Sequence, residues 1–223
     1  MERLERYIHE MSSPEDALME ELTRTTNQRA VHPQMLSGHI QGRFLGMLVR
    51  MLRPHRVLEI GTFTGYSALS MAAGMGAGAI LDTIEADDEQ EELIRSFVER
   101  SGYGDRIRKI YRKRIRLHIG SALAVMPSLN ETYDLVFIDG DKREYPAYYR
   151  MLMDEGRTVP LVRSGSYLIA DNILWYGKVA EPEQYRDPHT MAIREFNRMV
   201  REDDRVENVV LPLRDGLNLI RVK

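Results

Sequence analysis

The chain has 223 residues, of which 43% are hydrophobic and 29% are charged, and its formal net charge is −3. It contains no cysteine, which excludes disulfides and thiolate metal sites. Charges recur along residues 1–22, and no stretch approaches the roughly 18 apolar residues that span a membrane. We therefore expect a soluble, cytoplasmic protein with no membrane partner. The near-neutral charge gives no global bias toward nucleic acid.

The pattern of apolar residues changes along the chain. Residues 1–54 are expected to be mostly helical and to form an N-terminal arm, and the core is expected over 55–223. In the core, short β-branched runs alternate with amphipathic stretches such as 88–101, which predicts a parallel sheet wrapped by helices. The runs expected to form buried strands are 56–61, 79–85, 115–120, 133–140 and 166–172.

The C-terminal part has a different order. A predicted helix, 189–201, precedes two predicted strands, 205–213 and 216–223, and the Arg-Asp-Gly between them predicts a hairpin turn. No repeat or linker divides the chain, so we expect one domain over 1–223. The predicted fold class is α/β: a Rossmann-like, doubly wound, mostly parallel seven-stranded sheet with a C-terminal antiparallel hairpin and the N-terminal helical arm.

A glycine-bounded turn follows the first predicted strand, in the sequence VLEIGTFTGYSAL. A dinucleotide fingerprint would need glycine at the third and sixth positions from Gly61, but these hold Phe63 and Tyr66. A P-loop is excluded because no Gly-Lys-Ser/Thr follows. The remaining pattern of acid, Gly61, short turn, Gly65 and helix fits a nucleoside with an amino-acid tail, which is the shape of S-adenosylmethionine.

Two later features favour the same ligand. Glu85 ends the next strand about 20 residues downstream, where an acid can accept hydrogen bonds from both ribose hydroxyls. The segment 119–123, IGSAL, ends the third strand where an adenine would reach. Gly61 and Gly65 alone would be compatible with an ordinary turn between a strand and a helix, whereas the three signals in order favour the cofactor.

Oxygen-bearing side chains follow two predicted strands. Asp139 closes the fourth strand, and Asp171 and Asn172 close the fifth. If these strands are parallel neighbours, their tips lie within roughly 5 Å at the carboxyl edge, where open α/β sheets bind ligands. All-oxygen ligation selects a hard cation such as Mg²⁺, with Mn²⁺ or Ca²⁺ as alternatives. Lys142 lies close enough in the sequence to act as a catalytic base at the same site.

Each of these residues also has an ordinary structural interpretation. Asp139 and Asp141 could begin a calcium loop, but the twelfth position is Arg150 rather than glutamate. Asp171 and the following asparagine could form a polar turn, and Lys142 could be a solvated surface lysine.

Three long segments, 41–72, 133–149 and 168–179, resemble in content and order the cation-dependent O-methyltransferases of the catechol and caffeoyl-CoA type, which include many small bacterial members. The resemblance covers roughly residues 35–180 and the last strand. It implies a single class I methyltransferase domain over 1–223 that uses S-adenosyl-L-methionine, and a homodimer.

From the two strand ends, the expected metal ligands are Asp139, Asp171 and Asn172, and the expected catalytic residues are Lys142 and Asp139. Trp175 and Tyr176 could wall an aromatic substrate or simply pack. The positions implied to bind the cofactor are Leu36, Glu59, Gly61, Thr62, Phe63, Ser67, Glu85, Ala86, Ser121, Ala122, Asp139, Asp141 and Tyr148.

The chain also departs from the family pattern. Ser121 stands where aspartate is frequent, and Gly140 replaces a common alanine. The run 106–116, RIRKIYRKRIR, is longer than the usual connection and holds seven basic residues. It could be a solvated loop or a patch that binds a phosphate-bearing substrate.

Three functions therefore stay open. The leading one is O-methylation of a small aromatic vicinal diol, since two adjacent hydroxyls suit the open positions of the metal. The second is O-methylation of a hydroxyuridine in tRNA, which the basic run favours and the negative net charge disfavours. The third is a non-catalytic cofactor-binding protein.

Overall fold

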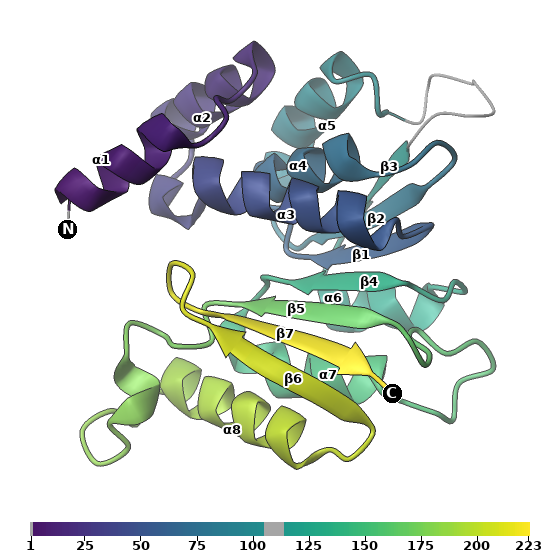
Figure 1. Ribbon diagram of the computed structural model, residues 1–223. Helices are drawn as coiled ribbons and strands as arrows, with labels where there is room; N and C mark the ends of the chain where they lie inside the picture. The colour runs from purple at the N-terminus through teal and green to yellow at the C-terminus, as the bar shows by residue number, and fades with distance from the viewer. Residues whose placement is uncertain (1, 105–113) are drawn as a thin grey trace.

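The computed structural model describes residues 2–104 and 114–223, which form a seven-stranded sheet between two layers of helices (Figure 1). The strand order is β3-β2-β1-β4-β5-β7-β6. The first five strands run parallel, and β7 pairs antiparallel with both β5 and β6. This confirms the predicted fold class. The strands are β1 (Arg56–Ile60), β2 (Ile80–Glu85), β3 (Arg114–Ile119), β4 (Leu135–Ile138), β5 (Tyr167–Asp171), β6 (Val206–Leu211) and β7 (Leu217–Val222).

The helices occupy the predicted connections. The expected helix 88–101 consists of a 3₁₀ turn followed by α5, and the expected helix 189–201 is α8. The α-helices are α1 (Glu2–Met11), α2 (Ala17–Arg29), α3 (Gly38–Leu52), α4 (Tyr66–Gly74), α5 (Glu91–Arg100), α6 (Ala122–Val125), α7 (Tyr145–Leu152) and α8 (Pro188–Glu202). The 3₁₀ turns are η1 (Pro33–Met35), η2 (Asp88–Gln90), η3 (Met126–Ser128), η4 (Lys142–Glu144) and η5 (Lys178–Ala180).

The central strands are apolar throughout because both faces of the sheet are covered. Leu58 and Val136 lie in a core cluster with α6, α7 and α8, whereas Val57 and Phe137 lie in a second cluster with α3, α4 and α5. Successive side chains of a strand point to opposite faces, so neighbouring residues enter different clusters. All four are fully buried, and each contributes about 1.5–3 kcal/mol relative to exposure.

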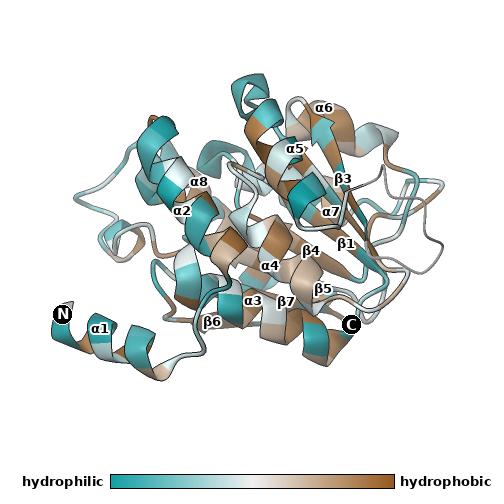
Figure 2. Cartoon of the chain, turned by 90° about the horizontal axis from the view of Figure 1, so that it is seen from above, coloured by the Kyte–Doolittle hydropathy of each residue, from teal (hydrophilic) through white to brown (hydrophobic). Residues whose placement is uncertain are grey.

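The N-terminal arm is smaller than expected, because α3 belongs to the core. Leu45 and Val49 of α3 are fully buried, and α3 packs against α4 so closely that a Cβ on Gly74 would overlap the carbonyl oxygen of Gly46. In contrast, α1 stands at the edge of the molecule (Figure 2) and leaves Leu4 63% exposed. Among the described residues, no helix is both long enough and apolar enough to cross a membrane.

Candidate active site

The carboxyl ends of β4 and β5 lie side by side, which is the condition on which the predicted metal site depended. The two strands are parallel neighbours with Ile138 paired to Ala170, so Asp139 and Asp171 follow at adjacent positions of the same sheet edge. Asp171 is only 2% exposed, and the Asp139 side chain is 17% exposed. Two carboxylates therefore lie close together with little access to water.

The environment of Asp171 disfavours its charge. Burial, followed by the nearby charge of Asp139, raises the pKa of Asp171 to about 6. The rise is opposed by two hydrogen bonds and by the charge of Lys142. The Gln41 Nε2 donates to Asp171 Oδ2 at 2.5 Å, and the backbone N–H of Asn172 donates to Oδ1 at 2.7 Å. Asn172 itself has a left-handed backbone (φ 57°), which turns the chain directly after the strand.

Lys142 is buried at this edge, so its interpretation as a solvated surface lysine is wrong. Its Nζ donates to Asp139 Oδ1 at 2.6 Å and to the Tyr145 hydroxyl at 2.8 Å. Lys142 begins the turn η4, whose N-cap is Asp141. The Tyr145 hydroxyl lies 3.0 Å from the carbonyl oxygens of Ile138 and Asp171, one of which can accept its single proton.

Tyr145 was missed from the sequence, although it belongs to this cluster. Its side chain is fully buried, and burial raises the pKa of its hydroxyl well above the usual value. The hydroxyl therefore stays neutral and fixes the lysine nitrogen. The available signal was the spacing of Tyr145, three residues after Lys142 at the start of a helix.

The glycine turn lies next to the carboxylates. Gly61 has φ +95°, and an added Cβ would overlap the carbonyl oxygen of Asp139. Only glycine permits this approach, which brings the turn after β1 against the loop after β4. Gly65, also at φ +95°, is the N-cap of α4. The turn and the carboxylate pair thus form one continuous edge.

Glu85 organises this turn in a way that the sequence did not reveal. Its Oε2 accepts from the backbone N–H groups of Thr62 (3.1 Å) and Phe63 (2.5 Å), and its Oε1 accepts from that of Asp87 (2.9 Å). Burial nevertheless raises the pKa of Glu85, because desolvation outweighs these bonds. The expected ribose contact stays a prediction.

Glu59 is completely buried beneath the turn. Burial raises its pKa to about 8, partly countered by the hydroxyls of Thr83 and Ser67. Its Oε2 accepts from Thr83, whereas Oε1 has no well-formed hydrogen bond to any residue in 2–104 and 114–223. Thr83 also contacts the Thr62 hydroxyl at 2.5 Å. An incompletely satisfied carboxyl group therefore lies directly behind the candidate cofactor site.

The remaining expected cofactor positions differ in accessibility. Tyr148 donates to Glu144 at 2.6 Å, and Arg143 binds Asp141 and lowers its pKa. Whether these positions contact a cofactor stays a prediction. Leu36, Ser67, Ala122 and Tyr148 are buried, Asp141 is partly buried, and Ala86 and Ser121 are exposed.

The two expected substrate residues lie in the loop after β5, both with left-handed backbones. The Trp175 ring stacks on His189 with centroids 5.5 Å apart, as the packing interpretation expects. Tyr176 is 76% exposed, and its N–H donates to Asp215 Oδ1 at 2.6 Å. Its ring is therefore accessible to a substrate.

Most of the basic run 106–116 lies outside the described residues, which include only 114–116 of it. Of the described part, Arg116 on β3 lies 3.7 Å from Asp82 and 3.8 Å from Glu131. Its charge is thus directed to carboxylates of this chain.

The candidate metal site has only two acidic ligands. Within the described ranges, no three His, Cys, Asp or Glu side chains are grouped so that they could hold a metal. The predicted metal site differs from such a group, because it has two carboxylates and takes its third ligand from an amide oxygen.

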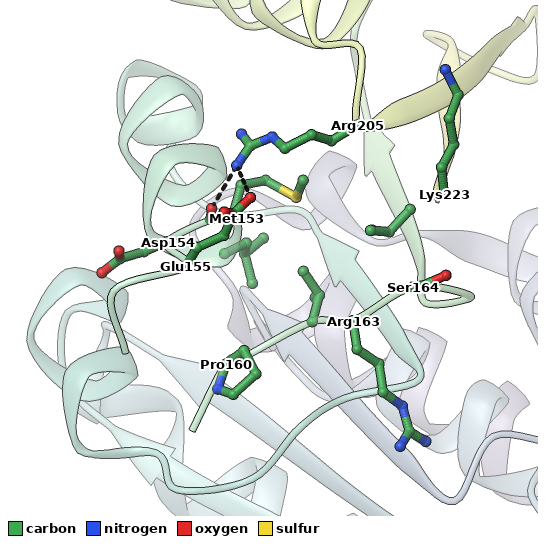
Figure 3. A pocket seen from close by; sticks show the side chains of 11 residues that line it. Met153, Asp154, Glu155, Pro160, Arg163, Ser164, Arg205 and Lys223 are labelled. Carbon is green, nitrogen blue, oxygen red and sulfur yellow. Dashed lines mark hydrogen bonds and ion pairs between the residues drawn. The ribbon is translucent and has the colours of Figure 1, made fainter. Parts of the chain in front are cut away.

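A cavity of about 300 Å³ lies at the opposite edge of the sheet, where β5 begins and β7 ends (Figure 3). Both of its arginines are in ion pairs: Arg205 pairs with Glu155 at 2.9 Å, and Arg163 pairs with Asp134 at 3.0 Å. The carboxyl edge instead holds a buried aspartate with a raised pKa, so it is the better candidate site.

Comparisons with known proteins relate the whole chain to one family. A family model described as O-methyltransferase matches residues 9–223. A caffeoyl-CoA O-methyltransferase from Populus kitakamiensis is 32% identical, with 99% of this chain and 93% of that protein covered. An O-methyltransferase from Bacillus cereus, solved in complex with SAH, is 28% identical with a TM-score of 0.86, covering 99% of this chain and 97% of the other. A Streptomyces achromogenes O-methyltransferase solved with SAM is 25% identical, with a TM-score of 0.86 and coverage of 99% and 96%.

Proposed function

The chain belongs to the O-methyltransferase family, and on that premise we propose that it methylates a hydroxyl of a small catechol-like aromatic, using S-adenosylmethionine and a divalent cation. The observation that carries the proposal is the cluster at the β4 and β5 tips. There, Asp139 and buried Asp171 lie beside the buried amine of Lys142. The SAH-bound and SAM-bound structural relatives support the choice of cofactor.

The residues present suit a hard cation. Burial, followed by the nearby charge of Asp139, raises the pKa of Asp171, and a cation bound beside its carboxylate would favour the charged form. Asp139, Asp171 and Asn172 would hold it, because carboxylate and amide oxygens are the ligands that Mg²⁺ and Mn²⁺ prefer. When bound, the cation would supply positive charge that lowers the pKa of a substrate hydroxyl.

The residues of the chain then position the reaction. The cofactor supplies a methyl group already activated by its sulfonium. Lys142 Nζ would receive the proton of the acceptor hydroxyl, whose oxygen would take the methyl group as the carbon–sulfur bond broke. Asp139 and Tyr145 fix that nitrogen through its hydrogen bonds.

Methyl transfer to catechol, with radiolabelled S-adenosylmethionine, tests the proposal. We expect transfer that EDTA abolishes and that excess MnCl₂ restores. Lys142→Met should lower the rate at least about 100-fold, the usual range for a lost general base. Lys223→Met is the matched control, because Lys223 lies at the opposite sheet edge (Figure 3).

Three results would contradict parts of the proposal. Transfer unaffected by EDTA would remove the metal assignment. Methylation of bulk tRNA but not of catechol would replace the substrate class. Cofactor binding without transfer to either acceptor would favour a non-catalytic protein.

A further inference from the structure

Gln41 connects the carboxylate pair to a distant part of the chain. It lies in the first turns of α3 and is 1% exposed. While its Nε2 donates to Asp171 Oδ2, its Oε1 accepts from Arg214 Nη1 at 2.9 Å. Flipping the amide would put an oxygen against the carboxylate and an NH₂ against the guanidinium, so its orientation is fixed by its two charged neighbours.

Arg214 comes from the turn between β6 and β7, which extends toward the N-terminal helices (Figure 1). Its backbone is left-handed (φ 50°). Besides Gln41, its guanidinium donates to the carbonyl oxygens of Ser37 and, at 3.2 Å, of Leu36. A single side chain therefore binds two acceptors in the segment that leads into α3 and one in the helix itself.

The sheet places this turn over the site. β7 pairs with β5 so that Asp171 lies opposite Leu217, three residues after Arg214. The guanidinium thus touches the segment that contains Leu36, an expected cofactor position, and acts on Asp171 through Gln41. The start of α3, the end of β5 and the turn between β6 and β7 are therefore linked at Asp171, a candidate metal ligand.

We propose that Gln41 and Arg214 are positioning residues that hold the Asp171 carboxylate for the cation and the Leu36–Ser37 backbone for the cofactor. The inference rests on the proposed function, since it assumes that Asp171 is a metal ligand. Gln41 removes rotational freedom from the carboxylate without adding charge, and Arg214 fixes Gln41. Groups that orient metal ligands typically change metal affinity by 10- to 100-fold.

Calorimetric titration of the purified protein with MnCl₂, without acceptor, tests the link independently of turnover. Gln41→Met keeps the size of the side chain but removes both bonds, and it should weaken Mn²⁺ binding at least about 10-fold. Gln41→Glu, which replaces the donor with an acceptor facing Asp171, keeps the test valid if the methionine variant misfolds. Arg214→Met should weaken both Mn²⁺ and SAH binding, because it releases Gln41 and the Leu36 segment together.

The pair should behave as one unit. The double variant should bind Mn²⁺ no more weakly than Gln41→Met alone, since Arg214 acts through Gln41. Arg214→Lys should recover only part of the affinity, because an ammonium lacks the planar fork that reaches several acceptors. Arg221→Met is the matched control: Arg221 lies on the same hairpin and pairs with Glu207, so both affinities should stay at the wild-type value.

Two outcomes separate this inference from the proposed function. If wild-type protein binds Mn²⁺ and the folded Gln41 and Arg214 variants match it within twofold, the inference is wrong while the metal assignment stands. If wild-type protein binds no Mn²⁺, the metal assignment fails and the inference falls with it. Thermal melts of all variants distinguish lost folding from lost binding.

Discussion

Two aspartates at opposite edges of the sheet have pKa values shifted in opposite directions. At the carboxyl edge, burial and the charge of Asp139 raise the pKa of Asp171 to about 6. At the other edge, Asp203 has its pKa lowered to about 2, chiefly by the guanidinium of Arg205, which lies 2.7 Å away and lines the cavity of Figure 3. Tyr149 adds a hydrogen bond to Asp203 at 3.0 Å.

The two shifts have opposite consequences for stability: the charged form of Asp203 stabilises the fold, whereas the charged form of Asp171 destabilises it. Asp203 is charged at neutral pH with a cation in contact, so its ionisation favours folding. Burial and the charge of Asp139 disfavour the charged form of Asp171, so its ionisation opposes folding unless a cation binds. Carboxylates with raised pKa values often mark sites that bind or react, although structural clusters can show the same shift.

The largest expected effect concerns activity. Asp171→Asn removes one of two carboxylates from the candidate metal site and should lower methyl transfer to catechol at least about 100-fold, with a matching loss of Mn²⁺ binding. Asp154→Asn, at the exposed edge of the Figure 3 cavity, should leave both measurements unchanged. Full activity in the Asp171 variant would show that Asp171 is not needed for methyl transfer.

The second prediction is a pH dependence of opposite sign at the two edges, measured by chemical unfolding without metal. The folded pKa of Asp171 exceeds its unfolded value of about 3.9, so its contribution should reduce stability as pH rises from about 4 to 6, by roughly 3 kcal/mol at most. The folded pKa of Asp203 is depressed, so its contribution is present above about pH 4 and disappears as pH falls toward 2.

Asp171→Asn should flatten the first dependence. The difference in slope from wild type is the quantity to compare, because Glu59 also has a raised pKa and titrates in an overlapping range. The absolute stability is less informative, since the new amide places a donor against either Gln41 or the Asn172 N–H. An unchanged slope would mean that Asp171 is not the group that titrates.

A smaller effect, on stability, is expected for Asp203, whose carboxylate is paired with Arg205. Asp203→Asn should destabilise the protein by roughly 1 kcal/mol at pH 7, a value reduced for screening because Arg205 is partly exposed. Methyl transfer should be unchanged, because the residue is the C-cap of α8, three residues before β6 begins, away from the candidate site. Urea unfolding and the catechol assay measure the two quantities. A loss of activity without a loss of stability would contradict the assignment of the two edges.

The sequence was sufficient for the elements whose signal is local. Alternating apolar runs predicted the mostly parallel sheet, in which Asp139 and Asp171 would share one edge because parallel strands end on the same side. That their two strands are neighbours was only a condition of the prediction, and the structure supplies it. Some strand ends were overextended: the predicted 133–140 is β4 over Leu135–Ile138, since Asp139 already belongs to the loop.

The supporting residues were not predictable in the same way. Gln41 is 130 residues from Asp171, and Arg214 is 173 residues from Gln41. Nothing in their local pattern distinguishes them from a helix-surface glutamine or a turn arginine. Their roles depend on how β7 and α3 dock against β5 and β1, which only the assembled fold determines.

The smallest expected effect comes from paired glycine substitutions at the two edges. A Cβ on Gly140, between Asp139 and Asp141, would lie 3.0 Å from the Tyr148 hydroxyl and 3.2 Å from Ile60 Cγ2, both buried. These neighbours must move by a few tenths of an ångström, so Gly140→Ala should cost below about 1 kcal/mol. At the other edge, a Cβ on Gly156 would meet only the Asp154 carboxylate at 3.2 Å.

Because that exposed side chain can rotate away, Gly156→Ala should change stability by no more than about 0.5 kcal/mol. The two urea midpoints give the comparison directly. If Gly140→Ala proves as neutral as Gly156→Ala, the loop between the β4 tip and Tyr148 must yield freely. The closeness of the carboxylates would then reflect strand pairing alone rather than tight packing around them. Gly61 would be the glycine whose replacement disturbs the site, because its Cβ would meet backbone that cannot rotate away.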